Sequence, residues 1–223
     1  MAEQRRDERR SAPKGRRNAI GADPRRVAYE VLRAVSNADA YANLVLPRIL
    51  DDTGLSDRDA ALATELAYGT LRATGTLDAV IDIVSARPIN TLDANVLNAV
   101  RLGVYQLLRT RVPRHAAVSA TVGATYGVLS QGQAGFVNAL LRKVSYRSPS
   151  DWMSRIAPDP QVDRLGYLAV TYAHPLWIAR AFLDALGGDL DQLEAALAAD
   201  DARPTVHLVA RPGRITAAEL ADR

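Results

Sequence analysis

Apolar residues recur at helical spacing throughout residues 23–147, and this periodicity constrains the fold more than any other feature of the chain. In the first segment Val27, Val31 and Val35 lie four residues apart, which is the stripe of an amphipathic helix. Short turns separate seven such segments, and no alternating pattern typical of a strand lies between them. The sequence therefore predicts an all-α helical bundle.

Several residues indicate where these helices begin or pack closely. Asp23 is a suitable N-cap, Ser56 with Asp59 has the spacing of a capping box, and Thr91 is expected to cap a later helix. Gly69 interrupts one helix, where a glycine is about 1 kcal/mol less favourable than alanine. We therefore expect another side chain to pack closely against Gly69.

The last two helices of the bundle are expected at about 115–129 and 136–146, the second one after Gly132 and Gly135. Tyr126 stands in the first of them among apolar neighbours, so we expect its ring to lie in the core.

A change of character follows Ser148. Prolines at 149, 158 and 160 indicate a connector, and helical patterns then occupy about 161–173, 176–187 and 189–200. Pro175 suits the first turn of the second of these helices, and Trp177 is expected to pack inside. Residues 148–202 are therefore predicted to be a helical linker.

The final segment, residues 203–223, has a different pattern. Residues 205–209 form a strand-like run, and Thr216 with Glu219 forms a capping box. A strand followed at once by a short helix predicts the start of an α+β subdomain that is truncated here, so we expect the natural protein to continue.

Composition excludes several classes of site. The 223 residues contain no cysteine, which excludes disulfides, thiolate metal sites and a thiol nucleophile. The three histidines are far apart and show no metal-ligand spacing, and the sequence lacks the long apolar run of a membrane span or signal peptide. We therefore expect a cytoplasmic protein with no metal, no membrane contact and no cofactor of its own.

Positive charge is concentrated at the N-terminus. Residues 1–26 carry nine basic groups against four acidic ones, whereas the whole chain has a net charge of only +3. Residues 1–22 also lack apolar periodicity, so they are predicted to be a disordered basic arm.

Four motifs in order along the bundle resemble the NusB family. They are Gly69-Thr70-Leu71-Arg72, the segment from Val100 to Leu108, Val112-Pro113 followed by His115-Ala116-Ala117-Val118, and the segment from Phe136 to Lys143. The later His174-Pro175-Leu176-Trp177 and Arg203-Pro204 are similar to the linker of the RsmB (Sun/Fmu) methyltransferases.

This resemblance implies a NusB-like RNA-binding domain at 23–147 in front of a methyltransferase. Such an enzyme would use S-adenosylmethionine to methylate carbon 5 of a cytosine in small-subunit ribosomal RNA, by thiolate attack on the base. The chain contains neither a cysteine nor a glycine-rich cofactor turn, so no catalytic residue is assigned to it. Its expected partners are ribosomal RNA and its own methyltransferase domain.

Basic residues of the arm, of the first helix and of the family motifs are the candidate RNA contacts. They are Arg16, Arg17, Arg25, Arg26, Arg72, Arg101, Arg109, Arg111, Arg114 and Lys143. For Arg72 and Arg101 a structural role, such as an ion pair with Asp78, is at least as well supported.

Two other functions remain open at this point. One is a NusB-type antitermination factor that binds leader RNA and a ribosomal protein, although the linker argues against it. The other is a protein-interaction domain without RNA binding.

Overall fold

The computed structural model describes residues 23–203 and 208–222, and all regular secondary structure in these residues is helical. The all-α prediction is confirmed for this part of the chain. No helix within it is long and apolar enough to cross a membrane.

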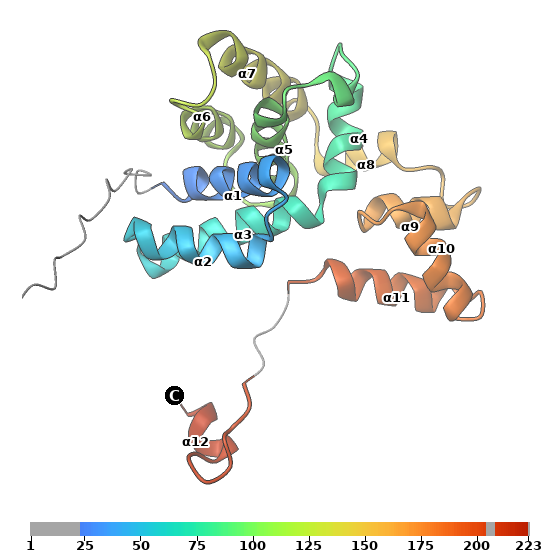
Figure 1. Ribbon diagram of the computed structural model, residues 1–223. Helices are drawn as coiled ribbons and strands as arrows, with labels where there is room; N and C mark the ends of the chain where they lie inside the picture. Colours follow the sequence, from blue (N-terminus) through green and yellow to red (C-terminus); the bar gives the residue numbers. More distant parts are fainter. Residues whose placement is uncertain (1–22, 204–207, 223) are drawn as a thin grey trace, which may run out of the picture.

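Eight helices form a bundle (Figure 1). They are α1 (Pro24–Ala38), α2 (Ala42–Thr53), α3 (Asp57–Arg72), α4 (Thr74–Val84), α5 (Ala94–Arg109), α6 (Arg114–Ala124), α7 (Gln131–Ser145) and α8 (Pro149–Ile156), with a short 3-10 turn at Ile89–Thr91 before α5.

Helix α5 runs through the middle of the bundle and contacts α1, α3, α4, α6, α7 and α8 (Figure 1). Its residues Val100, Leu102 and Val104 are completely buried, as expected of a helix that is covered on several sides. Gly103 lets α7 approach closely, because a Cβ at this position would lie 2.5 Å from the Leu141 side chain.

Gly69 of α3 makes the close contact that its place in the sequence predicted. A Cβ built at Gly69 would lie 2.0 Å from the hydroxyl oxygen of Tyr105 on α5. The α3–α5 crossing therefore depends on the missing side chain.

Three further helices, α9 (Arg164–Thr171), α10 (Leu176–Ala185) and α11 (Leu190–Asp201), pack together beside the bundle (Figure 1). They bury a second, smaller core that includes Leu168, Ala179, Leu193 and Leu197. The prediction of three helices in this segment is confirmed.

The connector expected after Ser148 contains an additional helix. Ser148 and Asp151 form a capping box that begins α8, with Pro149 in the first turn. Trp152 is buried in the bundle core and donates its indole N–H to the carbonyl of Val144 at 3.0 Å. Pro149 therefore begins a helix and does not mark a connector.

Two predicted helix starts are wrong. Asp93, and not Thr91, caps α5 by accepting hydrogen bonds from the N–H groups of Asn95 and Val96. Helix α7 begins at Gln131, within a capping box made by Ser130 and Gln133, so Gly132 and Gly135 lie inside it.

Two aromatic residues expected in the core are exposed. Helix α6 ends at Ala124, so Tyr126 lies in the following turn with 88% of its surface exposed. Trp177 in the first turn of α10 is 72% exposed.

The predicted strand at 205–209 lies partly outside the described residues, which resume at Leu208. Leu208 and Val209 have no regular secondary structure and are exposed. The predicted capping box of Thr216 and Glu219 is confirmed, and it begins α12 (Ala217–Ala221).

Candidate nucleic-acid interface

The candidate RNA contacts fall into two groups that differ in what neutralises their charge. Arg16 and Arg17 of the predicted arm lie outside the described residues. Most of the other candidates either pair with carboxylates or buried polar groups, or are exposed near helix ends, and Arg72 lines a small cavity.

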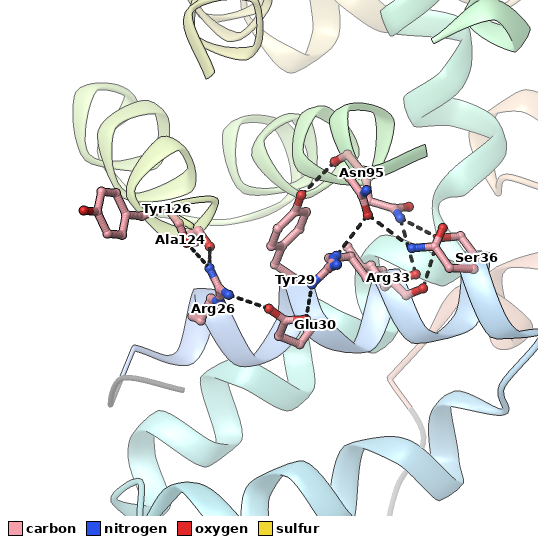
Figure 2. A network of polar contacts seen from close by, with 11 residues as sticks. Arg26, Tyr29, Glu30, Arg33, Ser36, Asn95, Ala124 and Tyr126 are labelled. Atoms are coloured by element: carbon pink, nitrogen blue, oxygen red, sulfur yellow. Dashed lines mark hydrogen bonds and ion pairs between the residues drawn. The ribbon is translucent and has the colours of Figure 1, made fainter. Parts of the chain in front are cut away.

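Arg26 fastens α1 to the end of α6 (Figure 2). One of its guanidinium nitrogens donates to the carbonyls of Ala124 and Tyr126, at 3.0 and 2.6 Å. A second nitrogen lies 2.7 Å from the carboxylate of Glu30. These three contacts occupy much of the donor capacity of the side chain.

Arg25, next to it, points toward the interior. Its Nε donates to the side-chain oxygen of the fully buried Gln106 at 2.8 Å. Gln106 in turn donates to Thr121 on α6 at 2.8 Å. The side chain of Arg25 therefore helps to hold α1, α5 and α6 together.

The polar network continues along α1 (Figure 2). Arg33 pairs with Glu30 at 2.6 Å and donates to Asn95 at 2.9 Å. The hydroxyl of Tyr29 donates to the Asn95 carbonyl at 3.0 Å, and burial raises the pKa of Tyr29 to about 12. A neutral Tyr29 is thus a stable hydrogen-bond donor near neutral pH, and this face of α1 serves packing.

Arg101 has the structural partner that the sequence suggested. It donates two hydrogen bonds to the carboxylate of Asp78, at 2.7 and 2.6 Å, and so ties α5 to α4. This forked geometry is the strong form of an arginine–carboxylate pair.

Arg72 and Arg109 line a small polar cavity of about 170 Å³ between the bundle and α11. Arg109 lies 3.2 Å from Asp201 and donates to the Thr171 carbonyl at 3.1 Å. Tyr105, also in the cavity wall, donates to Glu65 at 2.6 Å. Burial and this hydrogen bond raise the pKa of Tyr105 far above its usual value, so its hydroxyl stays protonated.

Arg111, Arg114 and Lys143 form the second group, and all three are exposed. Arg114 donates to the Ser145 carbonyl at 3.0 Å, and Lys143 donates to the Val84 carbonyl at 3.2 Å. Among the described residues none of the three lies within 4.0 Å of a carboxylate oxygen. The carbonyls orient Arg114 and Lys143 without neutralising them.

A groove of about 490 Å³ adjoins Lys143 at the C-terminal end of α7. We call it the α7 groove. It is lined by Ile83, Val84, Lys143, Tyr146, Arg147, Trp152 and Arg155. The sequence pattern identified Lys143 but missed Tyr146 and Arg155 as site residues, because the groove forms only where α8 folds back against α4 and the end of α7. The signal that could have indicated the groove from the sequence is Tyr146, an aromatic residue that stands among basic ones.

Comparison with known proteins agrees with this architecture. The model of the NusB family matches residues 22–146. T. maritima NusB superposes with a TM-score of 0.52 at 18% identity, covering 59% of this chain and 94% of that one. This likeness supports the fold.

Longer proteins match most of the chain. A putative methyltransferase of Mycobacterium tuberculosis is 56% identical over 200 residues, which are 89% of this chain and 44% of the relative. Ribosomal RNA small subunit methyltransferase B of Pseudomonas putida is 34% identical over 186 residues, which are 83% of this chain and 39% of the relative. The chain thus spans less than half the length of these curated relatives.

Proposed function

Because this chain belongs to the NusB family, we propose that its helical bundle binds ribosomal RNA for a methyltransferase. The observation that carries the proposal is a set of exposed cations that no carboxylate within the described residues neutralises, namely Arg111 just before α6, Arg114 at its start and Lys143 near the end of α7. The names of the relatives point to ribosomal RNA of the small subunit as the target.

The proposed contact is electrostatic and positions the RNA. Each phosphate that a basic side chain neutralises releases counterions, so binding weakens steeply as salt concentration rises. Arg114 and Lys143 are held by carbonyls on neighbouring helices, which lowers the conformational entropy lost when a phosphate is bound. The arm, with Arg16 and Arg17, would add further contacts.

The proposal for the whole protein is S-adenosylmethionine-dependent methylation of a cytosine at carbon 5. The aligned part of each relative is less than half of its length, so the cysteine nucleophile and the cofactor site would lie in sequence beyond residue 223. Residues 203–223 would then begin the α+β subdomain that joins the bundle to that domain. In this scheme the present chain binds and orients the substrate and performs no chemical step.

The proposal is tested by titrating a labelled fragment of small-subunit ribosomal RNA at several salt concentrations. A triple variant, Arg111→Gln, Arg114→Gln and Lys143→Gln, should bind roughly 10-fold to 100-fold more weakly at low salt. Its slope of log affinity against log salt should be shallower by about two, because three phosphate contacts are lost.

The matched control is a second triple variant, Arg48→Gln, Arg58→Gln and Arg180→Gln, which removes the same charge from exposed positions elsewhere. Equal losses in both triple variants would contradict a localised interface. A chain without residues 1–21 measures the contribution of the arm separately. If the unaltered chain fails to bind RNA even at low salt, the protein-interaction alternative replaces this proposal.

A further inference from the structure

The α7 groove combines three basic side chains with an exposed aromatic ring. Its walls come from the end of α4, the end of α7 and helix α8. Its volume of about 490 Å³ lies in the range of pockets that hold a small ligand, roughly 300–1,000 Å³. The groove is therefore large enough for one nucleotide.

The cations of the groove face it with little local compensation. Lys143 uses one of its three donors on the Val84 carbonyl. The guanidinium of Arg147 lies over the ring of Trp152, 6.0 Å from its centroid. None of the lining residues is acidic, so an anionic group would be favoured there.

Asp151 is an acidic residue beside the groove, and it also caps helix α8. It accepts a hydrogen bond from the N–H of Ser148 at 3.1 Å in the capping box of α8. Hydrogen bonds from Ser148, and to a smaller extent the charges of Arg147 and Arg155, lower the pKa of Asp151. Its single charge stays at the start of α8 and can offset only one of the three positive charges of Lys143, Arg147 and Arg155.

The groove presents an exposed aromatic residue on an ordered helix end. Tyr146 is 74% exposed and Ile83 is 48% exposed, whereas Trp152 is buried and anchored to the Val144 carbonyl. Tyr146 is the C-cap of α7, and its N–H donates to the carbonyls of Lys143 and Val144. An exposed ring at a helix end beside cations can serve as a stacking platform for a base whose phosphate lies on the basic side chains.

We propose that the α7 groove binds one unpaired nucleotide of the RNA, with its base stacked on Tyr146 and its phosphate held by Lys143, Arg147 and Arg155. This inference rests on the proposed function and makes it more specific. It requires an unpaired nucleotide, because the faces of a base in a continuous duplex are covered by its neighbours. The bundle thus selects single-stranded segments, loops or bulges over uniform helices.

The test uses fluorescence anisotropy with the full chain and two probes of mixed sequence. One is a single-stranded oligoribonucleotide of about ten nucleotides, and the other is the duplex formed with its complement. Tyr146→Ala should weaken binding of the single strand by roughly 10-fold, because one stacked base is lost. Tyr146→Phe should bind nearly as tightly as the unaltered chain, and duplex binding should not change in either variant.

Tyr126→Ala is the matched control, because Tyr126 is at least as exposed and lies in another part of the bundle. The salt dependence of Tyr146→Ala should equal that of the unaltered chain, since stacking releases no counterions. Thermal melting of each variant checks that the fold is retained, as expected for exposed side chains.

The outcomes separate the two proposals. If the cation triple variant weakens RNA binding but Tyr146→Ala behaves like Tyr126→Ala, the stacking site is refuted and the RNA-binding function stands. Equal weakening of single-strand and duplex binding by Tyr146→Ala would also refute it. Absence of RNA binding by the unaltered chain at low salt overturns both.

Discussion

The crossing of α3 and α5 at Gly69 leaves no space for a methyl group. A Cβ there would lie 2.0 Å from the Tyr105 hydroxyl oxygen and 2.2 Å from the adjoining ring carbon, and Tyr105 is held by its hydrogen bond to Glu65. We expect Gly69→Ala to lower the free energy of unfolding by about 1–3 kcal/mol, the usual range for overpacking. Urea denaturation followed by circular dichroism measures this change.

Gly123 near the end of α6 is the matched control, because a Cβ there would meet nothing within 4 Å. Gly123→Ala removes the conformational freedom of glycine from the unfolded chain and should raise stability by roughly 0.5–1 kcal/mol. We therefore expect the change in the free energy of unfolding to have opposite signs for the two substitutions. A neutral or stabilising Gly69→Ala would mean that α3 and α5 pack less closely than the structure shows.

At the scale of a helix, the start of α5 is set by a single carboxylate. Asp93 accepts hydrogen bonds from the N–H groups of Asn95 and Val96 at 3.0 and 3.1 Å. Asp93→Ala should therefore destabilise the protein by about 1 kcal/mol. Thr91, which bonds only to the Pro88 carbonyl in the preceding turn, should tolerate alanine with a smaller change. Thermal or urea unfolding of the two variants compares them directly, and a larger loss at Thr91 would contradict the assigned cap.

The presence of α1–α7 and α9–α11 could be predicted from the sequence, because apolar periodicity shows which face of a helix is buried. The ends of the helices were harder to predict from the sequence. Thr91 and Asp93 are both good capping residues, and which of them caps α5 depends on how the chain turns between α4 and α5. Two glycines likewise suggested a loop before α7, yet the Ser130–Gln133 capping box outweighs their low helix propensity.

The candidate site was also only partly predictable, because its contacts join residues that are far apart in the sequence. The exposure of Arg111, Arg114 and Lys143 agrees with their polar positions at helix ends. The carbonyl partners of Arg26 lie about a hundred residues away, so no local pattern separates this arginine from a solvated one. The α7 groove depends on α8, whose first turn contains the proline that suggested a connector.

At the scale of the whole molecule, the described residues form a large bundle core and a small core in α9–α11. Few side-chain polar contacts join the two cores within the part of the chain that the structure describes. Thr76 donates to the Val170 carbonyl at 2.6 Å, and Arg109 bonds to Thr171 and Asp201. A unit with such a small core is expected to open locally before the bundle unfolds. Arg109 supplies two of these contacts, so we expect it to help hold α9–α11 against the bundle.

Arg109→Ala should loosen α9–α11 and leave the bundle unchanged. The substitution removes a carbonyl hydrogen bond and a partly exposed ion pair, which together contribute roughly 1–2 kcal/mol. Amide hydrogen exchange in α9–α11 should accelerate by about 5-fold to 30-fold, while exchange in α5 and α7 stays the same. Arg111→Ala, which removes an exposed arginine two residues away, should have no such effect. Uniform acceleration in both cores after Arg109→Ala would instead show that the two units unfold together, and the second unit would then be an integral part of the bundle.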